Sequence, residues 1–372
     1  MEGKPLIDDS HPLDLQKLKD ALLQLYEWGI DDILIQDQEK MAVQRHGRII
    51  DVGNRPLELD TVQALLNEMH KATSSATLQQ GIDHNFPLAV EKDRKTTYRF
   101  RVNASASMGM YSNPLGCDIT MRSIAQLPPD LANLGVQDEL KEALFPRTGI
   151  VIVGGATGSG KSTTMGAIIK DILREEEGKR LLTYESPIEF DFRAIPGRTG
   201  RIAQSDVYVH LKDYAHATSN ALRRHPDVII LGEARDSETI SGAIHNSETG
   251  HTVYTTVHVN SVPEMFTRMI GVFPANETMR ALSGLIGSTR VLMYQALLPT
   301  IDGGRCAIRE WLVLTDEMRK DLYSVPADQI TAVMTELLHT HGRPLIKDVR
   351  EHYQSGRLSQ AIYDRMEAEV GQ

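Results

Sequence analysis

The chain has 372 residues, 41% of them hydrophobic and 24% charged, a composition typical of a globular protein with two domains, each large enough to bury a core. Its net charge of −10 and the lack of a basic stripe argue against a protein that grips nucleic acid or anionic lipid directly. No apolar run reaches the roughly 18 residues that cross a bilayer, and no export signal opens the chain, so we expect a cytoplasmic protein.

The first 125 residues combine helix and strand patterns. Leu15, Leu18, Leu22 and Leu25 recur at helical spacing and Gly29 follows as a stop, which predicts a core helix. A second helix is expected at residues 59–73, and strands at 31–36, 41–50, 97–109 and 117–124. Two adjacent prolines within residues 126–135 predict a linker. Residues 1–125 are therefore expected to form an N-terminal α+β domain.

Residues 136–372 follow an α/β pattern. Helical segments separate four apolar runs, which predict strands buried on both faces of a largely parallel sheet: 149–153, 180–184, 227–232 and 251–257. The tail, from about residue 313, predicts amphipathic helices. Cys117 and Cys306 stand far apart without metal-ligand spacing, so we expect two buried thiols rather than a disulfide or a zinc site.

The segment GATGSGKST, residues 155–163, has the spacing of a phosphate-binding loop between a strand and a helix. Its glycines let backbone N–H groups converge on phosphate oxygens. Lys161 supplies a mobile cation, and Ser162 offers an oxygen to Mg²⁺. We therefore predict binding of ATP with Mg²⁺. The binding residues would be Gly155, Thr157, Gly158, Ser159, Gly160, Lys161, Ser162 and Thr163.

Hydrolysis needs an acidic group near the metal and a group that orients or deprotonates water. Glu233 follows the strand DVIILG, at the sheet edge where ligands of open α/β sheets collect. Glu185 and Glu189 follow the strand RLLTY. His258 directly follows the strand HTVYTTV, on the side where a neutral imidazole can sense a phosphate. Without the phosphate loop beside them, the plainer interpretation would be solvated glutamates at strand ends and a structural histidine.

Four blocks in this order, GATGSGKST, TYESPIEF, ILGEARDSETIS and TGHTVYTTVH, resemble the Walker A motif, Asp box, atypical Walker B motif and His box of the secretion ATPases. This PilT-like family drives type II and type IV secretion and pilus extension or retraction. The resemblance implies a RecA-like P-loop NTPase domain behind a smaller PAS-like α+β domain. It also implies a homohexameric ring. Because the chain shows no apolar run long enough to span a membrane, such a ring is expected to dock on integral or peripheral membrane components of its machine.

The resemblance also implies roles for single residues. Glu189 would be the general base, Glu233 would act at Mg²⁺ or its water together with Ser162, and His258 would contact the γ-phosphate region. Arg101 and Arg122 match arginines that the family brings from the N-terminal domain to the nucleotide, where a guanidinium stabilises developing charge. Surface arginines on a sheet are the plainer interpretation of both.

Two departures from the usual pattern bear on the branch. The Asp box has Glu185-Ser186-Pro187 where pilus motors usually have Glu-Asp-Pro, and His225 stands where an aspartate is usual. With LLPT and REWLVL, the box looks like that of the DotB/TraJ-type ATPases of type IVB secretion and conjugation. We expect such a motor at the inner membrane. A type IV pilus motor, a hexameric nucleic-acid motor and a nucleotide-binding scaffold are the alternatives.

Overall fold

The computed structural model describes residues 7, 12–45, 47–94, 96–109, 115–124, 127–175 and 178–370. The chain divides into two compact units, Met1–Gln126 and Leu127–Gln372. Within the described ranges, no helix is both long and apolar enough to cross a membrane.

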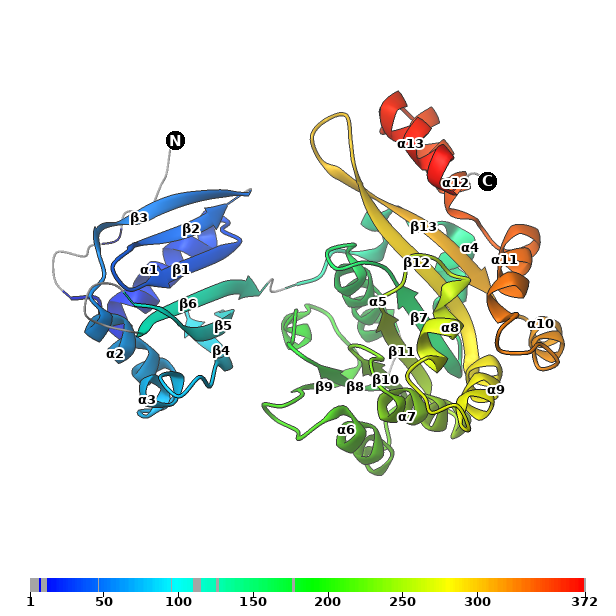
Figure 1. Ribbon diagram of the computed structural model, residues 1–372, viewed down its shortest axis with the longest axis horizontal. Coiled ribbons are helices and arrows are strands. Elements are labelled where there is room, and N and C mark those ends of the chain that lie inside the picture. Colours follow the sequence, from blue (N-terminus) through cyan, green and yellow to red (C-terminus); the bar gives the residue numbers. More distant parts are fainter. Residues whose placement is uncertain are drawn as a thin grey trace. The chain divides into compact units, whose positions relative to one another are not determined.

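The N-terminal unit is an antiparallel sheet with helices on one face (Figure 1). Its strand order is β3-β2-β1-β6-β5-β4. The strands are β1 (Asp32–Gln36), β2 (Lys40–Arg45), β3 (Arg48–Pro56), β4 (His84–Glu91), β5 (Thr97–Met108) and β6 (Leu115–Ile124). The helices are α1 (Leu15–Trp28), α2 (Leu59–Met69) and α3 (Ser74–Leu78). The α+β character predicted for this part of the chain is confirmed.

Helix α1 shows how local sequence sets this unit. Asp14 caps it by accepting a hydrogen bond from the Lys17 backbone N–H, and Gly29 ends it in the left-handed conformation, at φ +77°. Its predicted apolar stripe is confirmed, since Leu18, Leu22 and Leu25 are fully buried against the sheet. Leu15 opens the helix but is not part of that core.

The C-terminal unit is built on a seven-stranded sheet in the order β13-β12-β7-β11-β10-β8-β9. All neighbouring pairs are parallel except β12 and β13, which form an antiparallel hairpin. The strands are β7 (Gly149–Gly154), β8 (Arg180–Glu185), β9 (Arg201–Asp206), β10 (Val228–Leu231), β11 (Thr252–Val257), β12 (Thr289–Pro299) and β13 (Arg305–Val313). The four predicted strands are the four central ones, whereas β9, β12 and β13 were not predicted.

Both faces of this sheet are buried, as its continuous apolar strands predict. In β7, Ile150 and Ile152 point into a core that α6 (Tyr214–Ala221), α7 (Ser237–Glu248) and α9 (Thr278–Ser288) share. Val151 and Val153 point into the opposite core, with α4 (Asp138–Ala143) and α5 (Lys161–Glu175). The predicted α/β layering is confirmed.

The remaining helices follow or flank the sheet. Two short 3-10 helices are η2 (Phe192–Ala194) and η3 (Leu222–Arg224), and α8 is Glu264–Ile270. The predicted helical tail consists of α10 (Asp316–Leu322), α11 (Ile330–His341), α12 (Leu345–Gln354) and α13 (Gln360–Val370). Helix α12 packs on β13, the second strand of the β12–β13 hairpin (Figure 1). Cys117 and Cys306 are free and buried, as predicted.

Residues 127–135 differ from the linker we expected. They contain the 3-10 helix η1 (Leu131–Leu134), and Leu131 is fully buried in a core of the second unit. Lys170 of α5 donates to the Pro128 carbonyl at 2.8 Å and pairs with Asp130 at the same distance. This segment is anchored because both its apolar and its polar groups find partners on α5. Gln126, the first residue of the expected linker, lies outside the described residues.

Candidate nucleotide-binding site

The phosphate-binding loop connects β7 to α5, as predicted, and helix α5 begins at Lys161. Gly155 has φ +151° and Gly160 φ +85°, conformations that residues with a Cβ rarely adopt. Lys161 is only 8% exposed, and its Nζ donates to the carbonyls of Gly155 and Ala156 at 2.7 and 2.8 Å. The loop thus holds the Lys161 ammonium group at the point where phosphate oxygens would bind.

A phosphate group fits this loop. Ser159 Oγ is buried without a hydrogen-bond partner among the described residues, so the loop keeps a free polar atom. Ser162 is exposed on the first turn of α5. Burial lowers the pKa of Lys161, and the Glu233 carboxylate opposes that shift, which places the two charges within interaction range.

The motif residues lie at the carboxyl ends of four adjacent strands. The loop follows β7, His258 follows β11, Glu233 follows β10 and Glu185 ends β8, and these strands are consecutive in the sheet. Because all four strands are parallel, their carboxyl ends share one edge. The predicted strand-end positions of Glu233 and His258 are confirmed.

The Glu233 carboxylate lies between the side chains of Arg235 and His258. Arg235 Nε donates to Glu233 Oε2 at 2.7 Å, and His258 Nε2 lies 3.4 Å from Glu233 Oε1. The backbone is fixed on both sides, since the Thr256 hydroxyl donates to the Gly232 carbonyl at 2.6 Å and the Ala234 N–H donates to the Thr256 carbonyl. The Glu233 carboxylate is therefore oriented before any ligand arrives.

Glu185, rather than Glu189, is the buried carboxylate of the Asp box. Glu185 is 9% exposed, and its Oε1 accepts hydrogen bonds from the Thr183 hydroxyl at 2.6 Å and from Gln204 Nε2 at 3.4 Å. Glu189 is exposed, four residues beyond the strand end. Motif reasoning missed this difference, although the position of Glu185 as the last residue of a buried strand is a signal that favours it.

Burial raises the pKa of Glu185 from its ordinary value of 4.5 to about 7, against the opposing hydrogen bonds of Thr183, Gln204 and the Glu189 backbone. Because this pKa is higher in the folded state than in the unfolded chain, ionisation of Glu185 lowers the free energy of unfolding, and the loss grows as pH rises from 4.5 to 7.

We expect Glu185→Gln to be about 3 kcal/mol more stable than the wild type at pH 8 and nearly equal to it below pH 4.5. Urea unfolding at both pH values measures this difference. The same result for exposed Glu189→Gln would contradict the assignment to Glu185.

Arg101 and Arg122 lie in the N-terminal unit, directly opposite one another on β5 and β6. Both are exposed on the sheet. The Arg122 guanidinium on β6 forms two hydrogen bonds to Asp32, at 2.7 and 2.8 Å, and Asp32 is its register partner on the adjacent strand β1. The structure thus places the two arginines together, and their role toward the nucleotide stays a prediction.

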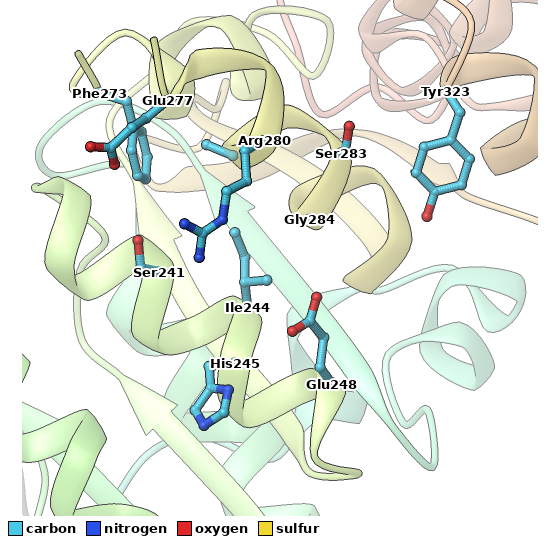
Figure 2. Close-up of a pocket in the computed structure, with 11 residues that line it drawn as sticks. Ser241, Ile244, His245, Glu248, Phe273, Glu277, Arg280, Ser283, Gly284 and Tyr323 are labelled. Atoms are coloured by element: carbon cyan, nitrogen blue, oxygen red, sulfur yellow. The ribbon is translucent and has the colours of Figure 1, made fainter. Parts of the chain in front are cut away.

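A separate pocket of about 550 Å³ lies between α7 and α9 (Figure 2). It is lined by His245 and Glu248 of α7, by Arg280 of α9 and by Tyr323, the residue that follows α10. None of the predicted nucleotide-binding or catalytic residues lines it. We therefore do not place the reaction there.

The chain matches known proteins over most of its length. The family model of type II/IV secretion system proteins matches residues 16–303. The type IV pilus retraction ATPase PilT of Pseudomonas aeruginosa is 31% identical over 291 residues, 78% of this chain and 80% of the relative. A twitching motility protein of Neisseria gonorrhoeae is 31% identical over 293 residues, 78% of this chain and 75% of the relative.

Solved structures agree with these relatives. The Legionella pneumophila ATPase DotB has a TM-score of 0.83 at 32% identity and covers 99% of this chain and 100% of its own. The pilus retraction motor PilT with bound ADP has a TM-score of 0.79 at 27% identity, over 92% of this chain and 95% of its own. The predicted RecA-like P-loop domain behind an N-terminal domain is confirmed by these likenesses. The chain belongs to the type II/IV secretion system protein family, among the PilT-like secretion and pilus ATPases and close to DotB.

Proposed function

We propose that this chain is a cytoplasmic ATPase that hydrolyses ATP to drive substrate transfer or assembly in a type IVB secretion or conjugation machine at the inner membrane. The observation that carries the proposal is the meeting of the phosphate loop, His258, Glu233 and Glu185 at one edge of the sheet. Likeness to DotB over nearly the whole of both chains supports the type IVB branch. A homohexameric ring docked on inner-membrane components is part of this proposal.

In the proposed reaction, Lys161 exchanges its two loop carbonyls for phosphate oxygens when ATP binds. Ser162 and Glu233 would hold Mg²⁺, which neutralises charge on the phosphates when bound. Arg235 keeps the Glu233 carboxylate oriented. We assign the general base to Glu185 in place of Glu189, because a buried carboxylate with a pKa near 7 accepts a proton efficiently at neutral pH. His258 would sense the γ-phosphate through its contact with Glu233.

A type IV pilus motor is the second candidate, because PilT is 31% identical over 78% of this chain. Deletion of the gene in its source organism separates the two. We expect loss of protein or DNA transfer, restored by the wild-type gene and not by a Glu233→Gln allele, with ATP turnover by the purified chain. Normal transfer with lost twitching motility would favour the pilus motor.

Arg122→Ala tests whether the N-terminal unit acts on the nucleotide. If the guanidinium stabilises charge in the transition state, kcat should fall at least about 10-fold while the Kd for ADP stays unchanged. Asp32→Asn is the matched control, since it weakens the same ion pair and keeps the arginine. Equal losses of kcat in both variants, with equal loss of thermal stability, would show that Arg122 serves only to hold Asp32.

A further inference from the structure

A buried amide lies beneath the phosphate loop. Gln295, in β12, is 2% exposed. Its Oε1 accepts hydrogen bonds from the Thr164 hydroxyl at 2.9 Å and from Arg309 Nε at 3.0 Å, and its Nε2 donates to the Ser159 carbonyl at 2.7 Å. A Cβ at Gly160 would lie 2.8 Å from that same Nε2. The loop thus packs closely against the Gln295 side chain, which contacts both the loop and the first turn of α5.

The amide is joined to a buried guanidinium on the next strand. Arg309, in β13, is the register partner of Gln295 and is 1% exposed. Its Nη1 donates to the Gly135 carbonyl at 3.3 Å, and its backbone N–H donates to Asp348 Oδ2 at 2.8 Å. A buried charge is costly unless it is paired or hydrogen-bonded, so the Arg309 guanidinium depends on its hydrogen bonds to Gln295 and Gly135.

Asp348 carries the network into the C-terminal helices. It lies on α12, is 1% exposed, and also accepts hydrogen bonds from Gln137 and from Arg343 Nη2. A continuous chain of hydrogen bonds therefore runs from the phosphate loop through β12 and β13 to α12. Gly135 and Gln137 add a branch to the segment that begins the second unit.

Two polar atoms of this network are unpaired within the described part of the chain. Arg309 Nη2 and Gln137 Oε1 are buried and have no hydrogen-bond partner among the described residues. Unsatisfied buried groups are rare in folded proteins and call for an explanation. The Arg309 donor and the Gln137 acceptor allow the network to form different hydrogen bonds when the loop moves. A network in which every polar group was already satisfied would resist such a change.

We propose that Gln295 and Arg309 are positioning residues that hold the phosphate loop in its nucleotide-binding shape and couple that shape to helix α12. The inference deepens the proposed function and rests on it. Its consequence is that nucleotide occupancy is transmitted to the C-terminal helices through hydrogen bonds inside one subunit.

Variants at Thr164 test the positioning. Thr164→Val keeps the shape of the side chain and removes the hydroxyl that donates to Gln295. We expect the Kd for a fluorescent ADP analogue, and the KM for ATP, to rise about 10-fold with kcat changed by less than about 2-fold, on the scale of a buried polar group left without its partner. Thr164→Ser, which keeps the hydroxyl, should restore both values. Unchanged Kd in Thr164→Val would overturn the positioning.

A second comparison removes the amide itself. Gln295→Met should raise the Kd as well, whereas Asn246→Leu, which removes another fully buried amide of the same unit, from α7, should lower thermal stability without changing the Kd. Equal Kd values for these two variants would mean that the Gln295 network is only structural.

Trp311 reports the coupling to α12. Its backbone exchanges two hydrogen bonds with Arg343, at 3.0 and 2.8 Å, two residues along β13 from Arg309. Since Trp28 is the only other tryptophan, a Trp28→Phe background isolates the signal. Saturating ADP should change Trp311 emission, and Gln295→Met should abolish this change at an ADP concentration that still saturates the site. A persisting change in Gln295→Met would overturn the coupling. Absence of ADP binding in the unaltered chain would instead overturn the proposed function, so the two failures are distinguishable.

Discussion

Lys161→Ala should lower ATP turnover at least about 1,000-fold and abolish detectable binding of a fluorescent ADP analogue. The side chain supplies the cation of the phosphate loop, and a cationic group that stabilises the transition state of phosphoryl transfer is worth about 10³–10⁵ in rate. The substitution also leaves the Gly155 and Ala156 carbonyls without their donor, so the empty loop loses its own brace. Steady-state phosphate release and fluorescence titration measure both effects.

Lys170→Ala is the matched control for Lys161→Ala. Lys170 is the other buried lysine of α5, at 5% exposure, and it holds Pro128 and Asp130 rather than the loop. We expect the control to lower the melting temperature and to keep turnover within about 3-fold of the wild type, because it loosens residues 127–135 without touching the nucleotide site. If Lys161→Ala retained as much turnover as Lys170→Ala, the site would have to lie elsewhere in the chain.

The features that the sequence predicted are those set by neighbours in the chain. Helix α1 follows from leucine periodicity and a glycine stop, and the phosphate loop follows from its glycine spacing. The four central strands were predicted because burial on both faces leaves an uninterrupted apolar run. Each of these signals is contained within about 15 residues, so a single sequence reveals it.

The features that were missed depend on distant pairing. Strand β13 mixes buried charges, Arg309 and Glu310, with apolar residues, so neither period stands out. Gln295 reaches Ser159 across 136 positions, and no local pattern marks that contact. Residues 127–135 were expected to be a linker because Pro-Pro breaks regular structure, but the anchor on Lys170 is again a long-range contact. Spatial contacts of this kind become visible only once the sheet order is known.

We expect the second large effect on kcat in a comparison of Glu185→Gln with Glu189→Gln, two substitutions in the Asp box. Glu185→Gln should lower kcat at least about 100-fold, because glutamine keeps the side chain's size but cannot take a proton from water. Binding of ADP should stay near the wild-type value. Exposed Glu189→Gln should lower kcat by less than about 3-fold if Glu185 is the base.

The pH profile decides whether Glu185 acts as a base or only as a buried support. In the wild type, kcat should rise with pH and level off above about 7, as the carboxyl that burial keeps protonated is ionised, and Glu185→Gln should lose this rising limb. A carboxylate that merely orients Thr183 and Gln204 would leave the limb in place after its replacement. A large loss of kcat in Glu189→Gln, with the limb preserved in Glu185→Gln, would return the base to Glu189 and make Glu185 a structural acid of the strand end.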